Sequence, residues 1–283
     1  MRLAFFGGIY NNYLSLEAAI RDARSRGAQR LYCLGDLGAF GPYPDRVFPL
    51  LHEADVICIQ GNYDDSIGND LSDCQCGYTD PRDNDFAQKS YDYTYANTSV
   101  QNRLWLRELP AERRFEQDGI RFLLCHGSPR KTNEFLWEST TSTQFLEKLA
   151  VDYAADVILA THTGICWQRA LSDGKWFVNV GVLGRPENDG QTHVWYTMLR
   201  TGDDARNADA VEQGGNGAGR SAGGRCPFPV EIEFIPLHYD HERLACEMRV
   251  EKLPEEFIET ILTGWWTTCL EVLPAKERRR GRW

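Results

Sequence analysis

The sequence opens with "RLAFFGGIYNN", residues 2–12. The apolar run from Leu3 to Phe6 ends in two glycines and is followed by two asparagines, which predicts a buried strand leaving its sheet through a tight loop. Ligands are usually held in such loops. However, Gly7, Gly8, Ile9 and Tyr10 offer no carboxylate, imidazole or thiol, so the chemistry must come from elsewhere in the chain.

The same pattern of strand, loop and helix repeats along the chain. "YLSLEAAIRDARSRG" (residues 13–27) places apolar side chains on one helical face, and "TQFLEKLAVDYA" (residues 143–154) predicts a second helix. Predicted strands are "LYC", "DVICIQ", "IRFLLC", "DVILA", "KWFVNVG", "THVWYTMLR" and "VEIEFIPL". This alternation predicts an α/β fold with a largely parallel core, whose loops gather at the carboxyl ends of the strands. Residues 66–97 are polar and rich in turn formers, and we expect them to be irregular.

Composition sets limits on the class of protein. Of 283 residues, 42% are hydrophobic and 25% charged, which suits one large domain or two small ones. No stretch approaches the roughly 18 uninterrupted apolar residues of a membrane span, and the chain opens without a signal-peptide pattern. The net charge of −10 argues against general nucleic-acid binding. Nine cysteines lie scattered through the chain, which indicates free thiols and a cytoplasmic location.

Composition also suggests the domain organisation. Residues 1–245 form one predicted domain, in which the Gly-rich stretch 201–229 is expected to be a flexible insertion. Residues 246–283 are expected to form a helical extension that ends in the basic tail "KERRRGRW". Trp265 and Trp266 in this extension suggest either an oligomer contact or a small satellite of the core.

Four potential metal ligands each follow a predicted strand. They are Asp36, Asn62, His126 and His162. Taken singly, each has a structural explanation as a turn or strand-capping residue. Because parallel strands bring their carboxyl ends to one edge, we expect the four side chains to converge. One carboxylate, one amide oxygen and two imidazoles suit a divalent transition ion such as Mn, Fe, Co, Ni or Zn.

The motifs "GDLGAFG", "GNYDD", "CHGSP", "ATHTG" and "NVGVLGRP" occur in this order. Together they resemble those of the calcineurin-like metallophosphoesterases, particularly the small bacterial phosphodiesterase branch. The resemblance covers residues 1 to about 200 and the strand "VEIEFIPLHYD". It implies a four-layer α/β/β/α sandwich, a two-metal site at the strand ends and attack on phosphorus by a metal-bound hydroxide. It also implies that Asp36 bridges two metals, with Asn62, His126 and His162 completing the second.

The sequence departs from the family pattern at one metal. The first loop of the family usually reads Asp-x-His, where this chain has Gly8 and Tyr10; the last histidine of its Gly-His-x-His motif is replaced by Gly164. Tyr63 stands where a histidine often follows the asparagine. The losses fall on one metal while every ligand of the other remains, so we expect one ion rather than two. Tyr10 is expected to fill the vacated volume or, alternatively, to reach the ion as a phenolate.

Smaller roles are open for other residues. Arg130 and Arg185 could hold phosphate oxygens or form surface ion pairs, and Tyr63 could act as a weak proton donor. Cys74 and Cys76 are expected to be free thiols of an irregular loop, with soft-metal binding as the alternative.

The sequence thus predicts a metal-dependent phosphoesterase that acts on a small phosphate-containing substrate. The alternative is a catalytically silent relative that binds a phosphate-containing ligand or a protein partner.

Overall fold

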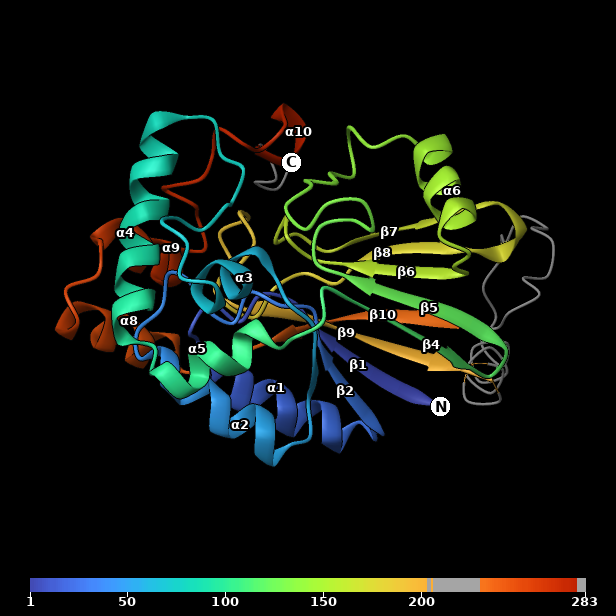
Figure 1. Ribbon diagram of the computed structural model, residues 1–283, viewed down its shortest axis with the longest axis horizontal. Coiled ribbons are helices and arrows are strands. Elements are labelled where there is room, and N and C mark those ends of the chain that lie inside the picture. Colours follow the sequence, from blue (N-terminus) through green and yellow to red (C-terminus); the bar gives the residue numbers. More distant parts are fainter. Residues whose placement is uncertain (203–204, 206–229, 279–283) are drawn as a thin grey trace.

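The computed structural model describes residues 1–202, 205 and 230–278. The expected insertion at 201–229 and the last five residues of the basic tail therefore lie almost wholly outside the described residues. Two five-stranded sheets form the centre of the molecule, and helices cover their outer faces (Figure 1).

The first sheet contains the N-terminal strand. Its order is β10-β9-β1-β2-β3, in which β1, β2 and β3 are parallel and β9 is antiparallel to both β1 and β10. The strands are β1 (Arg2–Phe6), β2 (Arg30–Cys33), β3 (Ile57–Cys58), β9 (Val194–Thr201) and β10 (Val230–Leu237).

The second sheet comes from the middle of the chain. Its order is β4-β5-β6-β8-β7, with β5, β6 and β8 parallel and the two edge strands antiparallel to their neighbours. The strands are β4 (Glu112–Gln117), β5 (Ile120–Cys125), β6 (Val157–Ala160), β7 (Trp167–Ala170) and β8 (Trp176–Asn179).

The helices and helical turns connect these strands and complete the chain. They are α1 (Tyr13–Ser25), η1 (Pro44–Arg46), α2 (Val47–Glu53), α3 (Asn62–Gly68), α4 (Pro81–Asn97), α5 (Val100–Arg107), α6 (Thr143–Asp152), η2 (Ser172–Gly174), α8 (His241–Val250), α9 (Glu255–Thr263) and α10 (Ala275–Arg278).

The alternation of side chains along β1 explains the layering. Leu3 and Phe5 point into the apolar layer between the two sheets, whereas Ala4 and Phe6 pack under the helices of the first sheet. On the second sheet, Leu123 and Ile158 face α6. Helix, sheet, sheet and helix are thus stacked in order, and the predicted α/β/β/α sandwich is confirmed.

The expectation that residues 66–97 are irregular is wrong for the second half of this segment, which forms the 17-residue helix α4. Asp80 caps the helix by accepting hydrogen bonds from the backbone N–H groups of Arg82 and Asp83, and Pro81 occupies the first helical position. Phe86 and Tyr91 lie on its buried face. The segment is polar and rich in tyrosine, so its sequence does not show a clear apolar period. The helix is stable because it packs against the rest of the protein.

The C-terminal helices belong to the same core as β1 and α1. Leu244, Phe257 and Ile261 are buried in that cluster, and the expected boundary after residue 245 falls inside α8. Figure 1 shows α4, α8 and α9 together at the end of the molecule toward which β1 runs. Within the described ranges, no helix combines the length and apolar character needed to cross a membrane.

Candidate metal centre

Asp36 lies just beyond β2 in a left-handed backbone conformation, with a φ of 58°. Its loop is held by the fully buried carboxylate of Asp64. One oxygen of Asp64 accepts hydrogen bonds from the N–H groups of Asp36 (2.7 Å) and Gly61 (2.8 Å), and the other accepts from the N–H of Leu37 (3.0 Å). Three charge-assisted hydrogen bonds therefore stabilise a conformation that non-glycine residues rarely adopt. Asp64 is not among the residues that the sequence predicted for the site, although it lies in the motif "GNYDD".

His126 follows β5 and reaches from the second sheet to the first. Its Nδ1 lies 2.7 Å from the carbonyl oxygen of Leu34. Nδ1 therefore carries a hydrogen atom and donates a hydrogen bond to that carbonyl. Its Nε2 lies 3.2 Å from Oδ2 of Asp36 and 3.1 Å from Nδ1 of His162. The backbone carbonyl thereby orients Nε2 toward the other candidate ligands, which is the usual arrangement of a metal-binding histidine.

His162 follows β6 and also has a left-handed backbone, with a φ of 36°. Its ring is buried, and the ring of Phe135 lies over it at 4.3 Å between centroids. Burial and the neighbouring His126 lower the pKa of His162 to about 3, so its imidazole is neutral near pH 7. A neutral imidazole is the form that binds a metal ion. Left-handed conformations at two candidate ligands are the kind of strain that clusters at functional sites.

Asn62 is the first residue of α3 and is also buried. Its Nδ2 donates a hydrogen bond of 2.8 Å to the carbonyl oxygen of Cys74. Its Oδ1 is buried and accepts no hydrogen bond from the described residues. A buried acceptor without a partner is costly, and a metal ion would satisfy it. The Tyr63 N–H donates to Oδ1 of Asp36 (3.0 Å), which places the start of α3 beside that carboxylate.

The charges of the site are those of an ion-binding cluster. Burial raises the pKa of Asp36. His126, His162 and the backbone N–H of Tyr63 together lower it by more, so the pKa of Asp36 lies below its ordinary value. Burial lowers the pKa of His126, yet Asp36 outweighs it and the pKa is raised. Each group therefore favours the charged form of the other, and the carboxylate favours a positive charge beside it. Ligand atoms of Asp36, His126 and His162 all lie within 4.8 Å of one another, so these residues fit a divalent ion.

Comparison with known proteins places the chain in a family. The model of the calcineurin-like phosphoesterase superfamily domain matches residues 1–203. The chain belongs to this superfamily. The resemblance to the calcineurin-like metallophosphoesterases is therefore confirmed, and the predicted ligands stand on the loops of a phosphoesterase fold.

Relatives match nearly the full length of the chain. An uncharacterized protein of Methanocaldococcus jannaschii is 22% identical over 282 residues, covering 93% of this chain and 98% of that protein. A solved structure of a hypothetical protein from Pyrococcus horikoshii covers 94% of this chain and 99% of its own, with a TM-score of 0.71 and 20% identity. A metallophosphoesterase from Sphaerobacter thermophilus covers 93% and 99%, with a TM-score of 0.65 and 20% identity. At this identity, these two structures establish the fold alone.

Tyr10 lies in the first loop, which offers no ligand to the candidate metal centre. Its ring packs against Gly8 and Gly184, where an added Cβ atom would lie within 2.4 Å and 2.3 Å of Tyr10 atoms. The ring also meets Phe40 edge-on at 5.3 Å between centroids. Burial strongly raises the pKa of Tyr10, which disfavours a phenolate. The side chain therefore fills volume, and two glycines provide the space for it.

Tyr63 and Arg130 are engaged away from the cluster. The Tyr63 hydroxyl lies 3.1 Å from Oγ of Ser90 on α4, and burial strongly raises its pKa. Arg130 is half exposed and forms an ion pair with Glu134. The predicted catalytic role of Tyr63 and the predicted phosphate contact of Arg130 gain no geometric support from these contacts.

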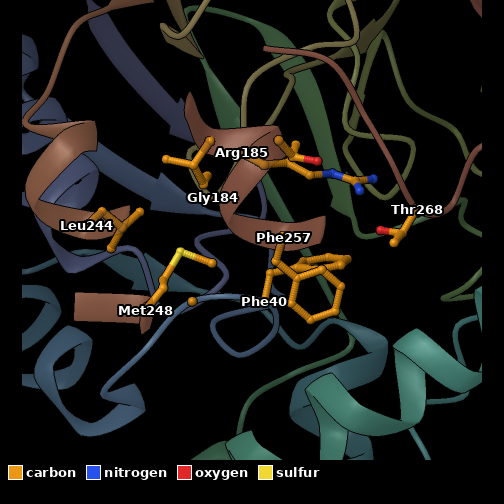
Figure 2. Close-up of a pocket in the computed structure, with 10 residues that line it drawn as sticks. Phe40, Gly184, Arg185, Leu244, Met248, Phe257 and Thr268 are labelled. Carbon is orange, nitrogen blue, oxygen red and sulfur yellow. The ribbon is translucent and has the colours of Figure 1, made fainter. Parts of the chain in front are cut away.

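Arg185 is buried behind Tyr10, with only 7% of its surface exposed. Its guanidinium stacks on Trp266 at 3.6 Å and lies 4.9 Å from the centre of Phe40. Its Nε is buried and donates no hydrogen bond within the described ranges. Figure 2 shows the side chain along a pocket with its guanidinium directed toward Thr268. That pocket has a volume of about 10 Å³, room for one water molecule at most.

Cys74 and Cys76 form a disulfide, so the expectation of two free thiols is wrong. This bond could not be predicted from the spacing of the cysteines, because pairing depends on the loop conformation. Among the other described cysteines, Cys33, Cys58, Cys125, Cys246 and Cys269 carry free thiols. Trp266 is a buried member of a small apolar cluster, as in the satellite interpretation, whereas Trp265 is 44% exposed.

Proposed function

We propose that the protein hydrolyses a phosphate ester with the help of one divalent transition-metal ion, such as Mn, Fe, Co, Ni or Zn, bound by Asp36, Asn62, His126 and His162. The carrying observation is the convergence of a buried carboxylate and two buried imidazoles. The buried Oδ1 of Asn62, which has no partner among the described residues, supports the fourth ligand. Membership in the calcineurin-like phosphoesterase superfamily supports the class of reaction.

The protein residues have distinct tasks in this proposal. A bound divalent ion would lower the pKa of water and polarise a phosphoryl oxygen. Asp36 contributes the negative charge that favours a cation, and the Leu34 carbonyl keeps the Nε2 of His126 directed into the site. Tyr10 fills the neighbouring volume, which supports one ion rather than two.

Arg185 is the proposed contact for a phosphate oxygen, for which the side chains around its water-sized pocket would have to move apart. It is a buried cation, and its Nε has no acceptor among the described residues. Stacking on Trp266 orients the planar guanidinium, whose fork of N–H groups matches two phosphate oxygens. Arg185→Lys would keep the charge but lose this planar geometry. We expect a higher KM, measured with the substrate used below.

The test combines metal analysis with an assay of bis(p-nitrophenyl) phosphate hydrolysis. Asp36→Asn and His126→Ala should each reduce metal content and lower kcat/KM by about 100-fold or more, because each removes an ion ligand. Exposed counterparts serve as controls: Asp152→Asn on α6 and His52→Ala on α2 should retain both properties. Turnover that is independent of added metal and unchanged in the ligand variants would disprove the proposal.

A second candidate is a silent relative that binds a phosphate-containing ligand. The closed nature of the site favours it, since Asp36, Asn62, His126 and His162 are all at most 8% exposed and Phe135 covers His162. If this candidate is right, the purified protein should contain stoichiometric metal and should hydrolyse neither phosphate monoesters nor phosphate diesters. Phosphate would then bind by calorimetry in the wild type but not in Asp36→Asn.

A further inference from the structure

We propose that the disulfide loop of Cys74 and Cys76 positions the metal ligand Asn62, so that its reduction weakens metal binding. This inference rests on the proposed metal centre. It assigns a role to a segment that carries no ligand of its own.

The first contact of the loop is with Asn62. The Cys74 carbonyl accepts the 2.8 Å hydrogen bond from Nδ2, and the Cys76 sulfur lies 3.5 Å from the same nitrogen. These contacts fix which end of the amide is the donor, and they leave Oδ1 without a hydrogen bond. If the loop moved, the amide could rotate and present its NH₂ group to a cation.

The electrostatics of His162 also involve this loop. Burial and the neighbouring His126 lower the pKa of His162, and the Cys76 backbone acts in the opposite direction. The Nε2 atom of His162 makes no hydrogen bond in the described structure, so the contacts with Asn62 are the ones that carry the inference. Outer contacts of this kind orient metal ligands.

The disulfide holds both contacts with Asn62 in place. One residue separates the two cysteines, so the bond closes a small ring that contains the Cys74 carbonyl carbon and the Cys76 sulfur. Asn133 adds support from the neighbouring loop by donating a hydrogen bond of 2.6 Å to the Gln75 carbonyl. Opening the ring would free the backbone at Cys74 and Cys76.

The disulfide is near an accessible hollow. Cys74 and Cys76 line a pocket of about 390 Å³ together with Tyr78 and Asn84, which is large enough for a small dithiol. In the exchange, one thiolate of the dithiol attacks a cysteine sulfur and forms a mixed disulfide, releasing the other cysteine as a thiol. The second thiol of the reductant then displaces the remaining cysteine. The protein gains two thiols, and the dithiol becomes a disulfide.

The experiment compares metal affinity in two redox states of the full-length protein. One sample is oxidised with glutathione disulfide; the other is reduced with dithiothreitol and desalted under argon. Alkylation and peptide mass analysis verify that Cys74 and Cys76 are modified only in the reduced sample. Titration with Co²⁺, followed by visible absorbance, should show binding about 10-fold to 100-fold weaker after reduction, and reoxidation should restore it.

Two variants separate this effect from general thiol chemistry. The double variant Cys74→Ser/Cys76→Ser should bind Co²⁺ as weakly as the reduced wild type and show no response to redox state. Cys246→Ser removes an exposed free thiol and should respond like the wild type. Thermal unfolding checks that both variants are folded.

The remaining outcomes contradict the inference. Equal Co²⁺ affinity in verified oxidised and reduced samples would overturn it while leaving the proposed metal centre intact. Tighter binding after reduction would instead make a cysteine thiolate a ligand. Failure of the disulfide to form under oxidising conditions would also overturn it. Absence of Co²⁺ binding in every state would remove the proposed function as well.

Discussion

Tyr10 shows how a single side chain can reshape the end of a strand. Its ring requires glycine on both sides, because a methyl group at Gly8 or Gly184 would overlap it. The opening loop carries no ligand because its volume is taken by an aromatic ring that packs with Phe40. The glycines that make this loop look like a ligand-binding turn in the sequence therefore serve packing.

Gly184→Ala tests this packing directly. The new methyl group would overlap the Tyr10 side chain far inside van der Waals contact, so we expect a loss of about 1–3 kcal/mol in the free energy of unfolding. Tyr10→Ala alone should cost about 3–5 kcal/mol through the cavity it leaves. Urea denaturation of both single variants and the double variant provides the cycle. Additive losses would show that the two positions do not interact.

At the scale of elements, parallel strands were predictable where an apolar run ends at a glycine or a histidine. Such strands are buried on both faces and therefore read as continuous apolar segments. Helix α4 was not predictable in this way, since its buried face includes Ser90 and Thr94 as well as Phe86. The stability of α4 depends on the segments that pack against it in the folded protein. Asp83 on this helix accepts hydrogen bonds from Cys269 and Glu271 of the C-terminal segment.

The link between β5 and β6 carries a pH dependence. Asp156 precedes β6 and accepts two side-chain hydrogen bonds and one backbone hydrogen bond from Arg121 on β5. Hydrogen bonding to Arg121 lowers the pKa of this carboxyl, which is only 4% exposed. A pKa that is lower in the folded protein means that the carboxylate stabilises the fold at neutral pH. This stability is lost as the pH falls below the ordinary aspartate pKa of about 3.9.

Asp156→Asn should therefore lower the free energy of unfolding at pH 7 by about 1–3 kcal/mol. Its loss of stability on acidification should be shallower than that of the wild type, because one linked proton is removed. Urea unfolding at a series of pH values measures both effects. Asp152→Asn breaks an exposed ion pair with Lys148 and should change stability by less than about 0.5 kcal/mol. Parallel pH curves for wild type and Asp156→Asn would refute the link.

At the scale of the whole molecule, the C-terminal segment completes the core beside the site. Trp266 stacks on Arg185, donates a hydrogen bond of 2.7 Å to the Pro186 carbonyl and lies near Gly164. The sequence predicted that candidate ligands at the strand ends would gather, and Asp36, His126 and His162 do lie together because the topology brings those strand ends to one edge. It could not predict Asp64, the disulfide loop or Trp266, since these act through contacts between distant segments.

Trp266→Ala should lower the free energy of unfolding by about 3–5 kcal/mol, because it empties a large buried volume. It should also raise the concentration of phosphate needed for half-saturation, since Arg185 loses the surface that orients it. Trp265→Ala alters an exposed neighbour and should have a smaller effect on both. Calorimetry with inorganic phosphate and thermal unfolding provide the two measurements. Unchanged phosphate binding in folded Trp266→Ala would show that Arg185, as oriented by Trp266, does not contact the phosphate.

Asp36 and Asn62 extend from one sheet, His126 and His162 from the other, and His126 already meets the Leu34 carbonyl across the divide. An ion bound by these residues would cross-link the two sheets. Removal of the ion by a chelator should then destabilise the whole fold. A free ion concentration of 100 times the dissociation constant adds about 2.7 kcal/mol to the free energy of unfolding, and chelation removes this contribution. Amide exchange would report this loosening along β2 and β5 together.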